Sequence, residues 1–205
     1  LGFDEDEIIL TSAKNGIGIK ELVEAIIEKV PSPKGIETEP LKALIFDSYF
    51  DSYRGIITSI RVVNGSVKVK DKIKMLATNK VYEVVELGIH NPREVEKKEL
   101  TTGEVGYLCG SIKNIEDVKV GDTICLESDT NATHLPGYKP MKPMVFCGLY
   151  PTTSSEFDNL KEALEKLKLN DASLEFTPET SEALGFGFRC GCLGLLHMEI
   201  IEERI

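Results

Sequence analysis

Two glycines near the start of the chain, Gly16 and Gly18, have the spacing of a phosphate-binding loop. A dinucleotide-binding G-x-G-x-x-G motif would need a third glycine at position 21, where the chain has Glu21. A second G-x-G at 185–187 fails in the same way, because position 190 is Cys190. The G-x-x-x-x-G-K-[ST] loop is absent from the whole sequence. The chain therefore lacks the clustered backbone amides and the lysine that hold phosphates.

Histidines and cysteines offer no catalytic or metal-binding pattern. The three histidines are scattered, without an H-E-x-x-H motif, and His197 lies between apolar neighbours, where a structural role is expected. The five cysteines are odd in number and lie mostly in apolar runs, which is typical of small buried side chains in a reducing cytosol. No serine or cysteine occupies a G-x-S-x-G elbow. The sequence predicts neither a catalytic residue nor a metal site.

Four lysines alternate through the segment S-V-K-V-K-D-K-I-K-M and could meet nucleic acid. They are Lys68, Lys70, Lys72 and Lys74. In a strand, this spacing would put them on one face, opposite apolar residues. One interpretation is a solvated face of the protein, and the other is a basic strip that binds RNA phosphates. The sequence leaves both open.

The length and the net charge of the chain limit the classes of protein to which it can belong. The chain has 205 residues and a net charge of −10, which by itself argues against nucleic acid as a partner. The acidic surplus lies in residues 1–40 and 145–205, however, and residues 41–144 are nearly neutral. No apolar run is long enough to span a membrane, and the acidic first residues are unlike a secretory signal. Because the chain starts at Leu1 rather than at a methionine, we expect it to be a piece of a longer protein. The cysteines in apolar runs indicate that this protein is cytoplasmic.

The first two thirds of the chain predict a strand, a helix and then many strands. Apolar residues indicate a short strand at 7–11 and a helix at 19–30 that Pro31 ends. Asn64-Gly65 is a hairpin signal. Short β-rich runs, without helical periodicity, predict a small antiparallel barrel. They are 41–50, 56–63, 67–76 (broken at 70–71), 81–89, 103–108 and 120–124.

The last third predicts a different architecture. A strand at 144–149 is followed by apolar residues at helical spacing from Phe157 to Leu167. Two strands, at 173–177 and 184–190, and a helix at 193–205 complete the order β-α-β-β-α. One more strand would make a ferredoxin-like domain. The expected fold class is therefore α+β and multidomain.

Three groups of residues resemble motifs of a known protein family. They are Ser12-Ala13-Lys14 after an apolar run, Tyr53-Arg54-Gly55 together with V-G-D-T-I at 120–124, and G-F-G-F-R-C-G-C-L-G-L-L-H-M-E-I at 185–200. The first resembles the S-A-K motif with which GTPases contact the guanine base, and the second resembles the barrel domain of translational GTPases. The third is the most specific and resembles the third-domain signature of the elongation factor 4 family, with Cys192 where phenylalanine is usual.

The resemblance implies a domain division and a function for the whole factor. Residues 1–31 would be a strand–helix remnant of a P-loop GTPase domain, 41–130 the barrel and 143–205 the truncated ferredoxin-like domain, with linkers at 32–40 and 131–142. The parent would be a ribosome-dependent GTPase that uses GTP and Mg²⁺, promotes back-translocation of tRNAs and supports translation fidelity. Its partners would be ribosomal RNA, ribosomal proteins and the tRNA-loaded ribosome.

For this chain alone, the resemblance implies only part of the function of the whole factor. It would carry ribosome-docking and relay domains and only the base-contacting part of the nucleotide site, so we expect no GTP hydrolysis and no bound cofactor. The resemblance also implies peripheral association of the parent with the cytoplasmic face of the membrane, although this chain has no amphipathic anchor. Two alternatives stay open: a related translocase-type translation factor, and a protein-interaction module without an RNA role.

Overall fold

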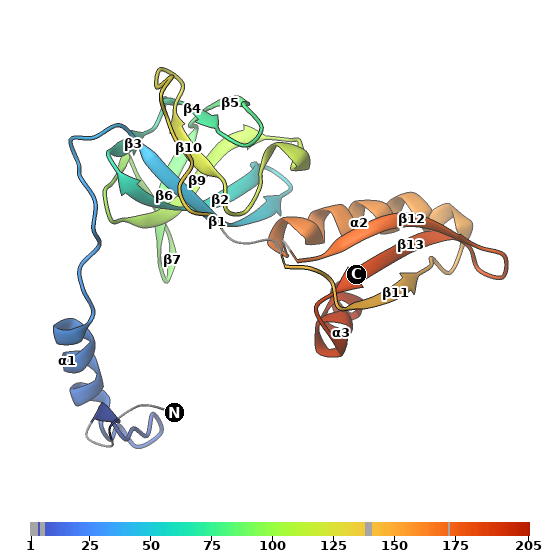
Figure 1. Ribbon diagram of the computed structural model, residues 1–205, viewed down its shortest axis with the longest axis horizontal. Coiled ribbons are helices and arrows are strands. Elements are labelled where there is room, and N and C mark those ends of the chain that lie inside the picture. Colours follow the sequence, from blue (N-terminus) through green and yellow to red (C-terminus); the bar gives the residue numbers. More distant parts are fainter. Residues whose placement is uncertain (1–3, 5–6, 138–140, 172) are drawn as a thin grey trace. The chain divides into compact units, whose positions relative to one another are not determined.

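The computed structural model describes residue 4 and residues 7–137, 141–171 and 173–205 (Figure 1). The chain forms two compact units, Leu1–Lys34 and Gly35–Ile205. Helices and strands are both present, so the α+β class is confirmed. Among the described residues, no helix is long and apolar enough to cross a membrane.

Among its described residues, the first unit contains one α-helix, α1 (Ile19–Lys29). Its apolar residues recur at spacings of three and four, as predicted, and it ends just before Pro31. The predicted strand at 7–11 is wrong, because residues 8–11 pair with no other strand and Leu10 is 82% exposed. A strand needs a hydrogen-bonded neighbour. The one β-pairing described in this unit is an isolated bridge between Ser12 and Ile17.

The second unit begins with an antiparallel, barrel-like sheet of eight strands (Figure 1). Their order across the sheet is β5-β4-β10-β1-β2-β9-β6-β7, and β3 pairs separately with β8. The strands are β1 (Lys42–Asp51), β2 (Gly55–Asn64), β3 (Ser66–Lys68), β4 (Lys72–Met75), β5 (Val81–Glu83), β6 (Glu86–Asn91), β7 (Arg93–Lys97), β8 (Glu99–Thr101), β9 (Val105–Ile112) and β10 (Thr123–Leu126). The predicted barrel architecture is confirmed.

Alternating side chains from these strands fill one apolar interior. Ala43 and Ile45 on β1, together with Ile56, Ile60 and Val62 on β2, are fully buried in it. Three features of this region differ from the sequence-based expectation. The predicted run at 81–89 forms two strands, β5 and β6, which are not neighbours in the sheet. Strands β7 and β8 were not predicted, and Asn64-Gly65 does not join a hairpin, because β3 pairs with β8 rather than with β2.

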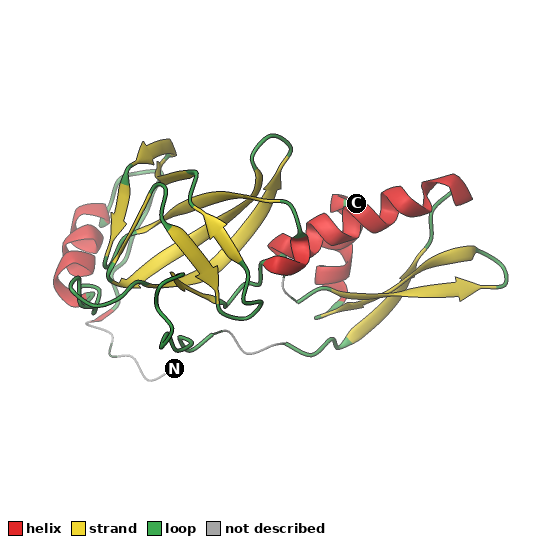
Figure 2. Cartoon of the chain, turned by 90° about the horizontal axis from the view of Figure 1, so that it is seen from above, coloured by secondary structure: helices red, strands yellow, loops and turns green. Residues whose placement is uncertain are grey.

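The remainder of the second unit has the predicted order β-α-β-β-α. Its elements are β11 (Val145–Leu149), α2 (Phe157–Asn170), β12 (Glu175–Ser181), β13 (Gly185–Cys192) and α3 (Leu195–Arg204). The sheet order β11-β13-β12 is that of a ferredoxin-like sandwich without its last strand. Leu164 of α2 and Ile201 of α3 pack with Phe188 and Cys190 of the central strand, so both helices cover one face of the sheet (Figure 2).

The C-terminal end of α2 packs into the barrel. Leu169 is 3% exposed and belongs to the apolar cluster of the barrel, not to that of the three-stranded sheet. The buried hydroxyl of Ser48 on β1 donates a hydrogen bond of 2.9 Å to the Leu169 carbonyl oxygen. Lys166 adds a cation–π contact, with its ammonium 5.1 Å from the centre of the Phe50 ring. Side chains of α2 therefore belong both to the apolar interior of the barrel and to the apolar cluster of the three-stranded sheet.

A cluster of charged side chains ties the β1–β2 turn to the β6–β7 hairpin. The Arg54 guanidinium lies 2.8 Å from Glu94, 3.1 Å from Glu86 and 3.5 Å from Asp51. The hydrogen bond from Arg54 lowers the pKa of the Glu94 carboxyl, although burial opposes this shift. Backbone N–H groups, first that of Arg54, lower the pKa of Asp51. Arg54 thus joins three segments of the barrel through one side chain.

Replacement of Leu169 by alanine should destabilise the second unit. The change removes a buried side chain from the barrel interior and leaves a cavity, for which about 2–5 kcal/mol of unfolding free energy is expected. Urea unfolding followed by circular dichroism measures the loss. Leu195→Ala is the matched control, because Leu195 is 64% exposed on α3 and its truncation should cost little. Equal losses for the two variants would contradict the packing described for Leu169.

Replacement of Arg54 by methionine should lower the Tm most at neutral pH. Since the pKa values of Glu94 and Asp51 are lowered in the folded state, their contribution is present above the unfolded pKa values, near 4. It is lost as the pH falls through the folded values. We expect a deficit of a few degrees at pH 7 that shrinks towards pH 3. Exposed Arg61 provides the control, as Arg61→Met; a deficit independent of pH would contradict the ion-pair assignment.

Candidate functional site

The predicted base-contacting residues lie in a tight loop before α1. The Ser12 N–H donates to the Ile17 carbonyl oxygen at 2.9 Å, and the Asn15 N–H donates back to the Ser12 carbonyl oxygen at 3.2 Å. Ser12 is half-buried, whereas Ala13 and Lys14 at the tip of the loop are exposed. The loop therefore presents these two residues to solvent, in an accessible position for a ligand.

The glycines of this segment shape the loop rather than a phosphate cradle. Gly18 has a φ of +68° and is the N-cap residue of α1. A side chain there would place its Cβ 2.2 Å from the Leu10 carbonyl oxygen, so glycine is needed for the close approach of the backbone. Gly16 also has a positive φ, of +70°. Both glycines therefore lie in the turn that joins the S-A-K loop to the helix.

The residues of this chain do not fit a complete GTP·Mg²⁺ site. The sequence contains no phosphate loop, and the part of the chain that the structure describes has no group of three or more carboxylate, histidine or cysteine side chains able to hold a metal. Ser12, Ala13 and Lys14 could contact a base alone. No chemical step on a bound nucleotide can be derived from these residues.

The four lysines do not form a single strand. Lys68 ends β3, Lys70 lies in a turn with a φ of +79°, and Lys72 and Lys74 belong to β4 in the other sheet. The expectation of one shared strand face is therefore wrong, because the chain turns at the predicted break at 70–71. The Asp71 carboxylate fixes this turn by accepting a hydrogen bond of 2.8 Å from the Lys68 N–H.

The lysine side chains are nevertheless mostly accessible. Lys68, Lys70 and Lys72 are exposed or half-exposed, and Lys74 is half-buried. Lys68 lies 3.5 Å from Glu99, and Lys72 lies 3.9 Å from Glu127. Exposed ion pairs of this kind contribute little to stability, so the ammonium groups can exchange their carboxylate partners for phosphates. The four lysines therefore lie on an accessible surface that also carries carboxylates.

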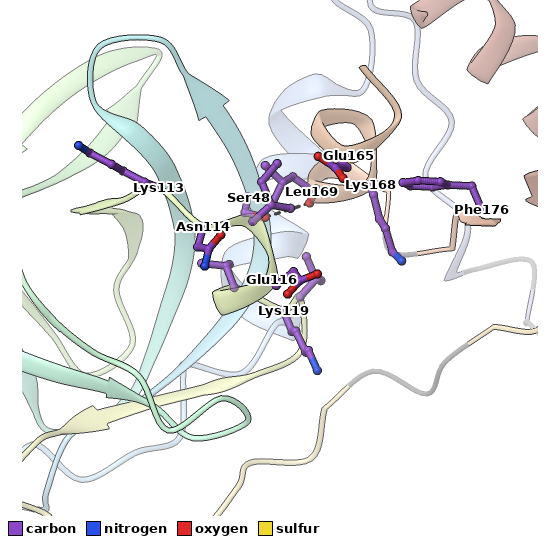
Figure 3. A pocket seen from close by; sticks show the side chains of 12 residues that line it. Ser48, Lys113, Asn114, Glu116, Lys119, Glu165, Lys168, Leu169 and Phe176 are labelled. Atoms are coloured by element: carbon purple, nitrogen blue, oxygen red, sulfur yellow. Dashed lines mark hydrogen bonds between the residues drawn. The ribbon is translucent and has the colours of Figure 1, made fainter. Parts of the chain in front are cut away.

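A cavity of about 870 Å³ lies between the segment 113–120 and the C-terminal end of α2 (Figure 3). Its walls carry both signs of charge, with Lys119 and Glu116 on the barrel side and Lys168 and Glu165 on the helix side. The full lining is Ser48, Lys113, Asn114, Ile115, Glu116, Val118, Lys119, Val120, Glu165, Lys168, Leu169 and Phe176. It includes no histidine or cysteine, and the Ser48 hydroxyl is bonded to the Leu169 carbonyl oxygen. The cavity therefore offers no nucleophile–base pair.

His197 has the structural role expected from the sequence. The Leu193 N–H donates to its Nδ1 at 2.9 Å, so the ring proton lies on Nε2, which donates to the Asp171 carboxylate. Although burial raises the pKa of Asp171, hydrogen bonds from Ser173 and His197 lower it overall. The imidazole thus links the β13–α3 turn to the loop after α2.

The cysteines are free thiols, and four of the five are buried. Burial raises the pKa of Cys190 to about 12, so this thiol stays protonated at neutral pH. Cys192 lies in the same apolar cluster as Cys190 and is fully buried. These side chains belong to the core of the domain and not to a reactive site.

Sequence reasoning missed two arrangements, the ion pairs of Arg54 and the packing of Leu169 into the barrel. The partners of Arg54 come from β1, β6 and β7, and only the Tyr53-Arg54-Gly55 motif could have drawn attention to this arginine. One feature of the sequence could have indicated that Leu169 packs against another part of the chain. Leu169 lies outside the apolar stripe of the helix, which includes Leu160, Leu164 and Leu167.

Comparison with known protein families supports the barrel assignment. Residues 55–125, from the start of β2 to β10, match the family described as Elongation factor Tu domain 2. A solved structure of a protein from Thermus thermophilus superposes with a TM-score of 0.72 at 25% sequence identity. The superposition covers 95% of this chain and 28% of that protein.

Curated relatives match the whole chain. Elongation factor 4 of Bacillus cereus (strain ATCC 10987 / NRS 248) and that of Bacillus cytotoxicus are each 59% identical over 205 residues. Elongation factor 4 of Halalkalibacterium halodurans is equally similar. Each alignment covers 100% of this chain and 34% of the relative, so the chain spans about a third of the length of the relatives it matches. With this identity along its entire length, the chain belongs to the elongation factor 4 family.

Proposed function

We propose that this chain is the part of a ribosome-dependent GTPase that docks on the ribosome and relays between the ribosome and the nucleotide domain. The whole protein would hydrolyse GTP with Mg²⁺, promote back-translocation of tRNAs and support translation fidelity. The observation that carries the proposal is the 59% identity to elongation factor 4 over all 205 residues. The barrel and the ferredoxin-like sandwich agree with it.

The proposed domain division follows the sequence-based boundaries. Residues 1–31 would be the end of the GTPase domain, 41–130 the second domain and 143–205 the third, with linkers at 32–40 and 131–142. The part of the first linker from Gly35 to Ile36 rests on the barrel: the Gly65 N–H donates to the Ile36 carbonyl oxygen at 3.0 Å. This contact supports a linker that is anchored at its barrel end.

The nucleotide role proposed for the chain is limited to the base. Ser12, Ala13 and Lys14 would line the guanine in the whole protein, and residues outside this sequence would hold the phosphates and Mg²⁺. Backbone amides and a lysine hold the phosphates in P-loop sites. A loop that contacts the base alone lacks these phosphate contacts.

The RNA role proposed for the barrel rests on Lys68, Lys70, Lys72 and Lys74. Their accessibility and their weak carboxylate partners support phosphate contacts. Each phosphate that a lysine neutralises releases counterions, so such binding weakens as salt rises.

Two alternatives differ in class. A related translocase-type factor would share the barrel and the third domain, but the relatives identified over the full chain are elongation factors 4. A protein-interaction module without an RNA role would use the acidic surface of the flanking segments instead. Its binding to ribosomes would be insensitive to the four lysines.

We propose a cytoplasmic location, as suits a translation factor. The peripheral membrane association implied by the family resemblance stays a prediction for the whole protein.

Isothermal titration calorimetry with GTP and Mg²⁺ should give no measurable binding to the 205-residue chain. The reason is the absence of phosphate-binding residues from the sequence. Buffer without protein sets the background heat, and a relative of full length provides the positive control. A micromolar isotherm with this chain would contradict the proposal that it carries only base contacts.

Ribosome binding by this chain should depend on the four lysines and on salt. Between about 50 and 200 mM salt, we expect affinity to fall steeply for the unmodified chain. The variant with Lys68, Lys70, Lys72 and Lys74 changed to Gln should bind more weakly, with a salt slope smaller by about one for each phosphate that is no longer neutralised. Filter binding at several salt concentrations measures both.

The control for that experiment changes net charge equally. Lys20, Lys29, Lys34 and Lys161 are exposed and lie outside the barrel. Their replacement by Gln should leave more of the binding intact. Equal losses for both quadruple variants would show a general charge effect, and binding unaffected by either would favour the protein-interaction module.

A further inference from the structure

The turn between β1 and β2 presents a tyrosine that the fold does not use. Tyr53 is 97% exposed, and no hydrogen bond to its hydroxyl occurs among the described residues. An aromatic side chain contributes to stability mainly by burial, and Tyr53 buries almost nothing. Exposed tyrosines are, however, enriched in protein–protein interfaces, where one ring supplies a large contact area.

The backbone around Tyr53 is held firmly although its side chain is free. The Asp51 Oδ1 atom accepts hydrogen bonds of 2.8 Å from the N–H groups of both Tyr53 and Arg54. Gly55 has a φ of +81°, and a Cβ there would lie 2.6 Å from the Ile112 carbonyl oxygen. The turn is therefore packed against β9 and locked by a side chain. A fixed turn with a two-torsion side chain loses little entropy on binding.

The charges beside this turn are unbalanced. One guanidinium, that of Arg54, serves three carboxylates, those of Asp51, Glu86 and Glu94. These four groups together carry a surplus of two negative charges, and His90 Nε2 lies 3.9 Å from Glu94. Side chains of Asp51, Glu86 and Glu94 are each a quarter to a third exposed, at 26%, 25% and 34%. Their surplus charge is thus accessible to a partner.

We infer that the β1–β2 turn is a docking site for an arginine or lysine side chain of a protein partner. The cation would lie over the face of the Tyr53 ring, and its charge would be met by Asp51 and Glu94. Cation–π contacts of this kind are stronger when water is excluded from them. An RNA phosphate, in contrast, would be repelled by the carboxylate surplus.

This site is separate from the lysines proposed to bind RNA. Gly55 begins β2 at the turn, and Asn64 ends β2 just before β3, which carries Lys68. A strand of this length spans roughly 30 Å. The barrel therefore has an acidic, aromatic surface at one end of β2 and a basic surface beyond the other end. The inference thus goes beyond the RNA role proposed above and does not depend on it.

A single-tryptophan variant tests the inference directly. The chain has no tryptophan, so Tyr53→Trp places one fluorophore at the turn and keeps an aromatic face. The probes are a hexa-arginine peptide, a hexa-glutamate peptide and a single-stranded oligouridylate. We expect only hexa-arginine to change the emission of the tryptophan at position 53 in a saturable way. Val105→Trp is the matched control, because Val105 is 52% exposed and pairs with Arg61, away from the turn.

Calorimetry on variants without the tryptophan measures separately how the Tyr53 ring and the Glu94 charge contribute to hexa-arginine binding. Tyr53→Ala should weaken hexa-arginine binding about threefold or more, and Tyr53→Phe should retain it, because the ring face is kept. Glu94→Gln should weaken it about twofold by removing one surplus charge. Equal responses of the two tryptophan variants, a preferential response to oligouridylate, or equal affinities of Tyr53→Ala and Tyr53→Phe would each overturn the inference.

Discussion

The pairing of β1 with β2 is the constraint on which the surfaces of the barrel depend. Their register runs from Lys42 opposite Asn64 to Asp51 opposite Gly55, with two shifts between. In a strand, a slip of one residue moves every side chain to the opposite face. The register of this pairing therefore places Ile45 and Ile60 in the interior and the Ser48 hydroxyl within hydrogen-bonding distance of the Leu169 carbonyl oxygen. It also places Tyr53 in the exposed turn between the two strands. Burial of the apolar residues fixes this register, and the exposed chemistry follows from it.

The parts of the fold that could be predicted are those with strong periodicity. Strands β1 and β2 are long runs rich in β-branched and aromatic residues, and helix α2 has apolar residues at spacings of three and four, so their patterns favour the structures that form. Strands β7 (R-E-V-E-K) and β8 (E-L-T) could not be predicted, because they are short, largely charged and stabilised by pairing with other strands. The wrong strand at 7–11 is the converse case: its apolar composition suits a strand, but no neighbouring strand in the described part of the chain pairs with it.

The candidate sites, too, could be predicted only where their geometry depends on residues close together in the sequence. A motif can place Ser12, Ala13 and Lys14 in a loop, because the flanking glycines allow the left-handed backbone that the loop requires. Alternation alone could not place the four lysines, because a turn at Lys70 sends two of them to another sheet. The Arg54 cluster joins residues up to 43 positions apart, from Asp51 to Glu94, and no local pattern encodes such a contact. Local geometry is readable from sequence, whereas convergence of distant side chains is not.

Net charge is a poor guide to what this chain can bind, for a physical reason. Charges on a protein surface are screened within about 8 Å at physiological salt, so a partner senses a local group and not the total of −10. Lys68 and Lys72 have carboxylate neighbours at 3.5 and 3.9 Å, but each pair leaves its ammonium largely exposed. At the β1–β2 turn the balance is reversed, since three carboxylates share one guanidinium. Because these two groups lie beyond opposite ends of β2, several screening lengths apart, the proposed phosphate contacts of the lysines and the inferred cation site at the turn would not weaken one another.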